Sequence, residues 1–213
     1  MSVGEQLIFF GSLKGLDSDE AAKRSEHWLA RLQLADWKDK KSGELSKGMQ
    51  QKVQFIATIL HDPELLILDE PFSGLDPVSV NLLKGIILDL KANGKTIIFS
   101  THQMEQVEQL CDDIALINHG TKVLGGGLRE VKSRFGRNTV ILSYEGADSF
   151  LTDDLVKKHT RFPNYNEILL RDGADAQELL RRALAAGAII NRFELVEPSL
   201  NEIFIESVTG HRA

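Results

Sequence analysis

The stretch Leu65-Leu66-Ile67-Leu68-Asp69-Glu70-Pro71 constrains the fold more than any other part of the chain. Its four consecutive apolar residues, without alternation, predict a strand buried on both faces, as in a parallel sheet covered by helices. The carboxylates of Asp69 and Glu70 follow the carboxyl end of this strand, which is where ligands bind in open α/β sheets. Because two adjacent acids are costly to bury, the pattern favours a site where a divalent cation or strong hydrogen bonds compensate their charge.

Strand and helix patterns alternate around this stretch. A helix with Ser46 near its N-cap precedes it, a helix over 78–91 follows it, and a second apolar strand over 96–99 leads into His102. If the two strands are parallel, His102 lies at the same sheet edge as Asp69. A helix start offers free N–H groups and a positive dipole end to a phosphate, although serine caps many helices that bind nothing. Alternation with short connections indicates an α/β fold.

Length, charge and cysteine content exclude several classes of function for this chain. The chain has 213 residues, enough for one core and a small second domain. Its net charge of −6, without a basic block, argues against nucleic acid as the main partner. The apolar stretch 183–190 is far shorter than a membrane span, and the first residues do not form a signal-peptide pattern. The single cysteine, Cys111, excludes an internal disulfide and fits a reducing cytoplasm.

The second half of the chain predicts a separate small domain. Gly125-Gly126-Gly127 is interpreted as a flexible junction. The expected elements beyond it are a helix over 128–135, a strand over 138–143, a helical stretch over 150–158, a hairpin into 168–170, a helix over 174–186, a strand over 189–196 and a last helix over 199–208. This order suits a two-layer α/β domain of ferredoxin-like type. It contains no recognisable constellation of ligand-binding residues.

Four motifs occur in a defined order. They are Leu45-Ser46-Lys47-Gly48-Met49, the segment 62–71, Ser73-Gly74-Leu75-Asp76 and Ser100-Thr101-His102. In this order and spacing they resemble the nucleotide-binding subunit of an ATP-binding cassette (ABC) transporter. The resemblance implies a partial P-loop NTPase-like core, with a parallel sheet and helices, over residues 1–128. Residues 129–213 would then form the C-terminal extension domain.

The resemblance also implies residue roles. Residues Leu45, Ser46, Lys47, Gly48 and Met49 would be the signature that contacts the γ-phosphate of ATP held by the opposite subunit. Asp69 would hold Mg²⁺ through water, and Glu70 would act as general base on the attacking water. Asp76 would belong to the D-loop at the dimer interface, and His102 would be the switch histidine. Lys47 and Met49 replace the glycine and glutamine of many members, which we interpret as subfamily variation.

The C-terminal part is similar to the extension carried by drug-, sodium- and polysaccharide-export ATPases of the same family, including its Glu197-Pro198-Ser199-Leu200 ending. This similarity implies an ATPase subunit that energises export through a separate membrane permease. Such subunits work as homo- or heterodimers with ATP and Mg²⁺. They are cytoplasmic and peripheral on the inner face of the cell membrane.

The sequence departs from the family pattern in one respect that affects the expected ATP hydrolysis. The sequence contains no G-x-x-x-x-G-K-[ST] phosphate loop, and the family's adenine-stacking aromatic residue and glutamine loop are missing as well. We therefore expect the carboxyl-terminal part of such a subunit, inactive in hydrolysis when alone. The alternative is a non-catalytic truncated fragment that binds or regulates a partner. A soluble cassette ATPase of DNA repair, chromosome or ribosome function is less favoured, because those usually carry coiled coils or basic extensions.

Overall fold

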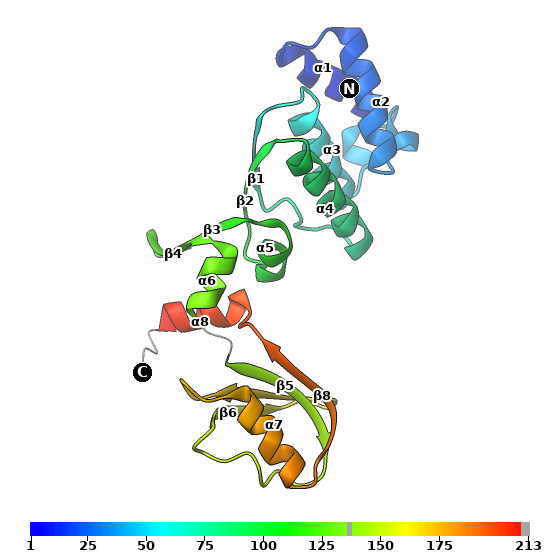
Figure 1. Cartoon of the computed structure of the whole chain (residues 1–213). Coiled ribbons are helices and arrows are strands. Elements are labelled where there is room, and N and C mark those ends of the chain that lie inside the picture. The colour runs from blue at the N-terminus through cyan, green and yellow to red at the C-terminus, as the bar shows by residue number, and fades with distance from the viewer. Residues whose placement is uncertain (136–137, 210–213) are drawn as a thin grey trace. The chain divides into compact units, whose positions relative to one another are not determined.

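A computed structural model describes residues 1–135 and 138–209 (Figure 1). The chain divides into two compact units, residues 1–106 and 107–213. The boundary predicted between residues 128 and 129 rests on sequence resemblance rather than on contacts, and it stays a prediction. No helix among the described residues is both long and apolar enough to cross a membrane.

The first unit is built mainly of helices around two strands. Its elements are α1 (Val3–Leu13), α2 (Ser18–Arg31), the short 3₁₀ helices η1 (Ala35–Trp37) and η2 (Ser42–Glu44), α3 (Lys47–Ile59), β1 (Leu65–Asp69), α4 (Pro77–Ala92) and β2 (Thr96–Ser100), and α5 (Met104–Leu110) crosses into the second unit. As predicted, Ser46 is the N-cap of α3. Helix α1 begins at Val3 and is capped by the Ser2 side chain, which accepts from the Glu5 N–H.

Strands β1 and β2 pair in parallel, with Leu65 opposite Thr96 and Asp69 opposite Ser100. The predicted burial on both faces of β1 is wrong. Leu66 and Leu68 are buried, whereas Leu65 and Ile67 are 51% and 69% exposed. The reason is that α3 and α4 lie on the same side of the two strands (Figure 1), so the described helices cover only one face of the pair.

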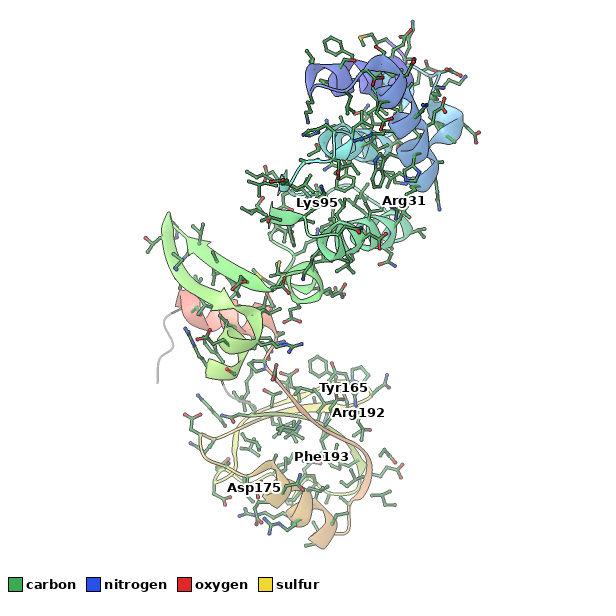
Figure 2. The ribbon with its side chains drawn as sticks, turned by 45° about the horizontal axis from the view of Figure 1, so that its top comes forward. Arg31, Lys95, Tyr165, Asp175, Arg192 and Phe193 are labelled. Atoms are coloured by element: carbon green, nitrogen blue, oxygen red, sulfur yellow. The ribbon has the colours of Figure 1, made fainter. Side chains whose placement is uncertain are left out.

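Ion pairs join separate segments of the first unit at its surface. Arg31 of α2 lies 2.6 Å from Asp89 of α4, and Lys95 lies 2.8 Å from Asp62 (Arg31 and Lys95 are labelled in Figure 2). Partly exposed pairs of this kind contribute at most about 1 kcal/mol each. Burial of apolar side chains on α3 and α4 therefore supplies most of the stabilisation, through Phe55, Ile56, Ile59, Leu83, Ile86 and Ile87.

The second unit begins with a hairpin. It contains β3 (Asp113–Asn118), β4 (Thr121–Gly127), α6 (Leu128–Arg134), β5 (Thr139–Glu145), β6 (Val156–Arg161), β7 (Asn166–Leu170), α7 (Ala176–Ala185), β8 (Ile189–Val196) and α8 (Leu200–Thr209). A tight turn joins β3 to β4, with Asn118 paired to Thr121. Gly125 to Gly127 were predicted as a flexible junction, but they lie in β4 and pair with β3. Glycine suits this place because a Cβ on Gly125 would lie 3.1 Å from the Ile114 carbonyl oxygen.

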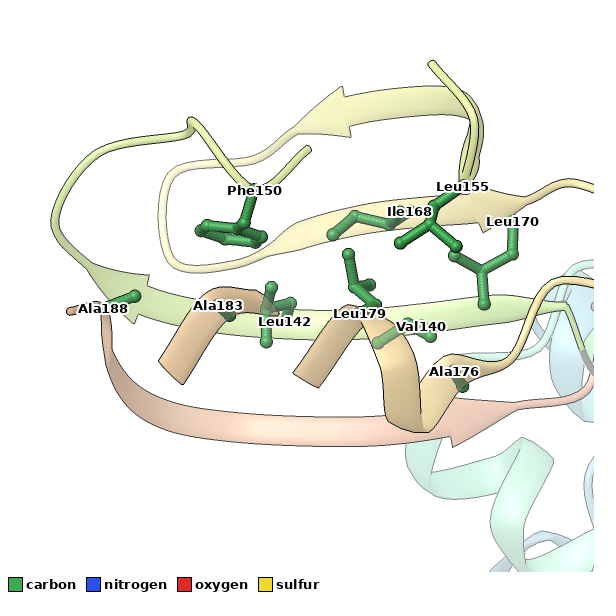
Figure 3. Close-up of a cluster of buried hydrophobic side chains, with 10 residues drawn as sticks. All are labelled: Val140, Leu142, Phe150, Leu155, Ile168, Leu170, Ala176, Leu179, Ala183 and Ala188. Atoms are coloured by element: carbon green, nitrogen blue, oxygen red, sulfur yellow. The ribbon is translucent and has the colours of Figure 1, made fainter. Parts of the chain in front are cut away.

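The remaining strands form a four-stranded antiparallel sheet in the order β6-β7-β5-β8. This is the strand order of the predicted ferredoxin-like fold. Its core lies between the sheet and α7 and includes Val140, Leu142, Ile168, Leu170 and Leu179 (Figure 3).

The predicted helix over 150–158 is wrong. Phe150 and Leu155 enter the core from a loop, and Thr152 accepts backbone hydrogen bonds from Leu155 and Val156 in a tight turn. β6 then begins at Val156, because the chain gains a ladder of hydrogen bonds with β7 there.

Candidate active site at the carboxyl end of the parallel strands

The carboxyl ends of β1 and β2 bring the predicted acids and histidine together. The ladder continues one residue beyond β1, since the Glu70 N–H donates to the Ser100 carbonyl at 3.1 Å. The Ser100 hydroxyl donates to the Asp69 carboxylate. Glu70 has a φ of +43°, a left-handed conformation that costs non-glycine residues on the order of 1–3 kcal/mol. Such strain is found most often where a side chain must be held for function.

The Glu70 carboxylate is held by three groups that follow β2. The Nδ1 atom of His102 lies 2.7 Å from Glu70 Oε1, and the His102 backbone N–H donates to the same oxygen at 3.1 Å. The Thr101 hydroxyl donates to Oε2 at 3.3 Å. The His102 and Glu70 side chains are 78% and 34% exposed. A side-chain contact this exposed adds little stability, so the arrangement orients Glu70 and leaves it accessible to a ligand.

The parallel pairing of β1 and β2 confirms the predicted placement of Asp69, Glu70 and His102 at one sheet edge. No role was predicted for the hydroxyls of Ser100 and Thr101, which bond to the two acids. Their position at the carboxyl end of β2 was the available signal, because both precede His102 at the same edge.

The predicted signature residues, 45–49, lie at the start of α3. The Ser46 hydroxyl accepts from the Met49 N–H at 3.3 Å, and Leu45 is only 6% exposed. Leu45 therefore packs in the core, whereas Ser46 and Lys47 are exposed to solvent. A Cβ on Gly48 would lie 3.1 Å from the Gly74 carbonyl oxygen. Glycine thus lets this turn approach the loop that precedes Asp76.

Ser46 and the Glu70–His102 pair remain separate groups. No hydrogen bond or ion pair that we find in the described residues joins the Ser46 side chain to Glu70 or to His102. Helix α3 also reaches the Glu70 backbone, because the side-chain amide of Gln51 lies 3.5 Å from the Glu70 carbonyl oxygen. One chain therefore presents two distinct polar surfaces.

Asp76 is the N-cap of α4. Its carboxylate accepts from the Ser79 hydroxyl at 2.6 Å and from the Val78 and Ser79 N–H groups at 3.0 Å each. The Ser79 hydroxyl, followed by these backbone donors, holds the pKa of Asp76 below its ordinary value of 3.8. Near neutral pH Asp76 is an anion whose oxygens are occupied by the first turn of its own helix.

This pKa shift predicts an acid sensitivity of α4. Because the folded pKa lies below the unfolded value of 3.8, the stabilisation is fully present above that value and is lost as the pH falls through the folded pKa. We expect urea midpoints to fall below pH 4, and the change attributable to this residue to disappear in Asp76→Asn. Asp36→Asn, at an exposed aspartate of η1, serves as a control. An unchanged pH profile in Asp76→Asn would contradict the assignment.

Comparison with known proteins gives the family. The chain is 44% identical over 211 residues to an uncharacterized ABC transporter ATP-binding protein of Alkalihalophilus pseudofirmus, a match that covers 98% of this chain and 78% of the relative. The chain belongs to the family of ABC transporter ATP-binding proteins. A fluoroquinolones export ATP-binding protein of Mycobacterium tuberculosis is 42% identical over 143 residues, covering 67% of this ABC chain and 46% of that protein.

Family profiles and a solved structure agree with this membership. Residues 1–73 match the profile described as ABC transporter, residues 39–108 match an AAA domain (putative AbiEii toxin, Type IV TA system), and residues 126–208 match the C-terminal domain of ATP-binding protein DrrA1-3-like. The solved ATP binding subunit of an ABC transporter superposes with a TM-score of 0.59 at 32% identity. That match covers 64% of this chain and 57% of the solved chain, so this ABC chain spans little more than half of the known structure.

The donor set of the ABC chain fits Mg²⁺ in part. Among the described residues no group of three or more histidine, cysteine, aspartate or glutamate side chains is arranged to hold a metal. However, Mg²⁺ in nucleotide sites usually takes one or two carboxylates and completes its shell with substrate phosphates and water. The Asp69 carboxylate, exposed and supported by the Ser100 hydroxyl, is a hard oxygen donor of that kind.

Proposed function

We propose that this chain belongs to an ATP-hydrolysing subunit that energises export through a separate membrane permease. The observation that carries the proposal is the Glu70 carboxylate, held by His102 and Thr101 at the carboxyl end of β1 and next to Asp69. Positioned charges of this kind are what phosphoryl transfer requires, because positioning and charge neutralisation provide most of its catalysis.

In this proposal Glu70 is the general base. Its carboxylate accepts the proton of a water molecule as that water attacks the terminal phosphate of ATP. His102 and Thr101 are positioning residues, because their hydrogen bonds fix the direction in which the Glu70 oxygens face. Asp69 would hold Mg²⁺, which supplies charge neutralisation on the phosphates when bound.

The signature turn acts on a second subunit in this account. Ser46 and the residues after it present a helix N-terminus to solvent, separate from Glu70. We propose that this turn contacts the phosphate of ATP bound to a homologous subunit, in a homo- or heterodimer. The loop that contains Gly74 and Asp76 packs against the same turn and would lie at that interface.

Substitutions at Ser46 separate this role from helix capping. Asparagine and aspartate cap helices about as well as serine, so both variants should keep the free energy of unfolding within about 0.5 kcal/mol of wild type. Ser46→Asp also places a negative charge beside the proposed phosphate. We expect ATP hydrolysis by an intact partner subunit, stimulated by this chain, to fall about 100-fold with Ser46→Asp and much less with Ser46→Asn. Equal rates for the two variants would argue against a phosphate contact.

The missing phosphate loop favours a second candidate function. Since the sequence has no G-x-x-x-x-G-K-[ST], we propose that this chain alone hydrolyses ATP near background. A non-catalytic fragment that binds or regulates an intact ATPase has the same property. The two functions predict different results for a chimera in which a phosphate-loop segment is placed before Met1. Turnover that depends on Glu70 supports the catalytic subunit, and its absence in a folded chimera supports the fragment.

The same family membership supports a proposal for the partner and the location. The relative from Mycobacterium tuberculosis is named for export of fluoroquinolones, which supports a permease as the partner of this chain. We propose a cytoplasmic subunit, peripheral on the inner face of the membrane. The net charge of −6 supports the proposal that nucleic acid is not a partner.

A further inference from the structure

Strand β8 forms one edge of the four-stranded sheet and pairs along one side only, with β5. Within residues 138–209 no backbone hydrogen bond joins its outer side to another element. The pairing with β5 is regular from Arg192 to Val196, so the outward N–H and C=O groups of this segment are regularly spaced. Such an edge is a template for another strand unless its side chains prevent pairing.

The side chains on this edge carry opposite charges. Arg192 and Glu194 are two residues apart, so they lie on the same face of the strand on either side of Phe193 (Figure 2 labels Arg192 and Phe193). Arg192 Nε lies 3.1 Å from Glu194 Oε2, and the two side chains are 53% and 51% exposed. Two charges of the same sign would repel a second copy of the strand. Arg192 and Glu194 have opposite signs, so they cause no such net repulsion.

The charge pattern of β8 is complementary to the same pattern on a second, antiparallel copy of the strand. When two copies of β8 pair antiparallel about a twofold axis at Phe193, Arg192 of each copy lies opposite Glu194 of the other. The edge thus gains two cross-strand pairs of opposite charge. Leu195, which is 44% exposed, would be covered by the second strand. We propose that the β8 edge centred on Phe193, residues 190–196, is an interface for a second copy of this chain.

The test is charge reversal followed by mixing. Arg192→Glu and Glu194→Arg each place like charges opposite one another in a homodimer, but the two variants are complementary to each other. We expect each variant alone to raise the dimer dissociation constant at least about tenfold. An equimolar mixture should associate as wild type does, and so should the double variant R192E/E194R. Association is measured by analytical ultracentrifugation of the full chain without nucleotide, so the outcome does not depend on ATP hydrolysis.

Two controls make the result specific. Arg181→Glu reverses a charge that is 68% exposed on α7 and should leave association unchanged. Far-ultraviolet circular dichroism establishes that each variant is folded. The exposed face of β1 is another surface through which copies can associate, but that association is insensitive to charges on β8. Failure of the mixture to restore association, equal association of all variants, or a monomeric wild-type chain would overturn the proposal.

Discussion

Replacing Glu70 by glutamine in a chimera that carries a phosphate loop before Met1 is expected to lower ATP turnover by about 100- to 10,000-fold. Glutamine keeps the size of the side chain and its hydrogen-bond acceptor for Thr101 or His102, but it does not take a proton from water. ATP binding should persist, because Glu70 acts on the water and not on the nucleotide. Turnover and equilibrium ATP binding are measured on the same preparation.

Glu64→Gln is the matched control for this experiment. Glu64 precedes the amino end of β1, the opposite end of the same strand, and is exposed. Its substitution should leave turnover within about twofold of the parent chimera, as is usual for surface positions away from a site. Full turnover in Glu70→Gln would remove the general-base assignment. Loss of ATP binding in Glu70→Gln would mean that the substitution disturbs the sheet edge instead.

The second large effect is expected in the core of the antiparallel sheet. Leu142 of β5 is fully buried among Val140, Phe150, Ile168 and Leu179. Leu142→Ala should lower the free energy of unfolding of this unit by about 2–5 kcal/mol, through lost burial and the cavity left behind. Leu184→Ala on α7, where the side chain is 57% exposed, is the control and should cost far less.

The position of the aromatic residues allows the two units to be followed separately. Both tryptophans, Trp28 and Trp37, lie in the first unit, and both tyrosines, Tyr144 and Tyr165, lie in the second. In urea unfolding of Leu142→Ala, the transition seen by tyrosine fluorescence should occur at a lower urea concentration than in the wild-type chain. Tryptophan fluorescence reports the first unit in the same titration. A tyrosine transition that moves no further than in Leu184→Ala would contradict the packing described here.

The sequence predicted elements well where local signals determine them. Ser46 as N-cap follows from the capping preference of serine, and the limits of β8 follow from a stretch with several β-branched and aromatic residues between Gly187 and Pro198. The common edge for Asp69 and His102 follows from parallel pairing of two apolar strands. The first two predictions need only the residue types within a few positions, and the third also needs the two strands to pair in parallel.

The wrong predictions concern features that depend on which other elements pack or pair with a segment. Burial of Ile67 depends on which helices cover the sheet, and the apolar pattern alone does not say that α3 and α4 share one side. Residues 150–158 have charges and apolar residues at helical spacing, but pairing with β7 begins at Val156. Gly125 was interpreted as a source of flexibility, whereas a close carbonyl oxygen explains it. Contacts distant in sequence determined the outcome in each case.

The most direct test of the central proposal is the rate of ATP hydrolysis by this chain, alone and mixed with an intact ATPase subunit that carries a phosphate loop, in the presence of Mg²⁺. The account predicts a rate near background for the chain alone and stimulation of the partner that Ser46→Asp abolishes and Ser46→Asn retains. Sustained hydrolysis by the chain alone, or stimulation unaffected by Ser46→Asp, would contradict the proposal that its signature turn completes the ATP site of a second subunit.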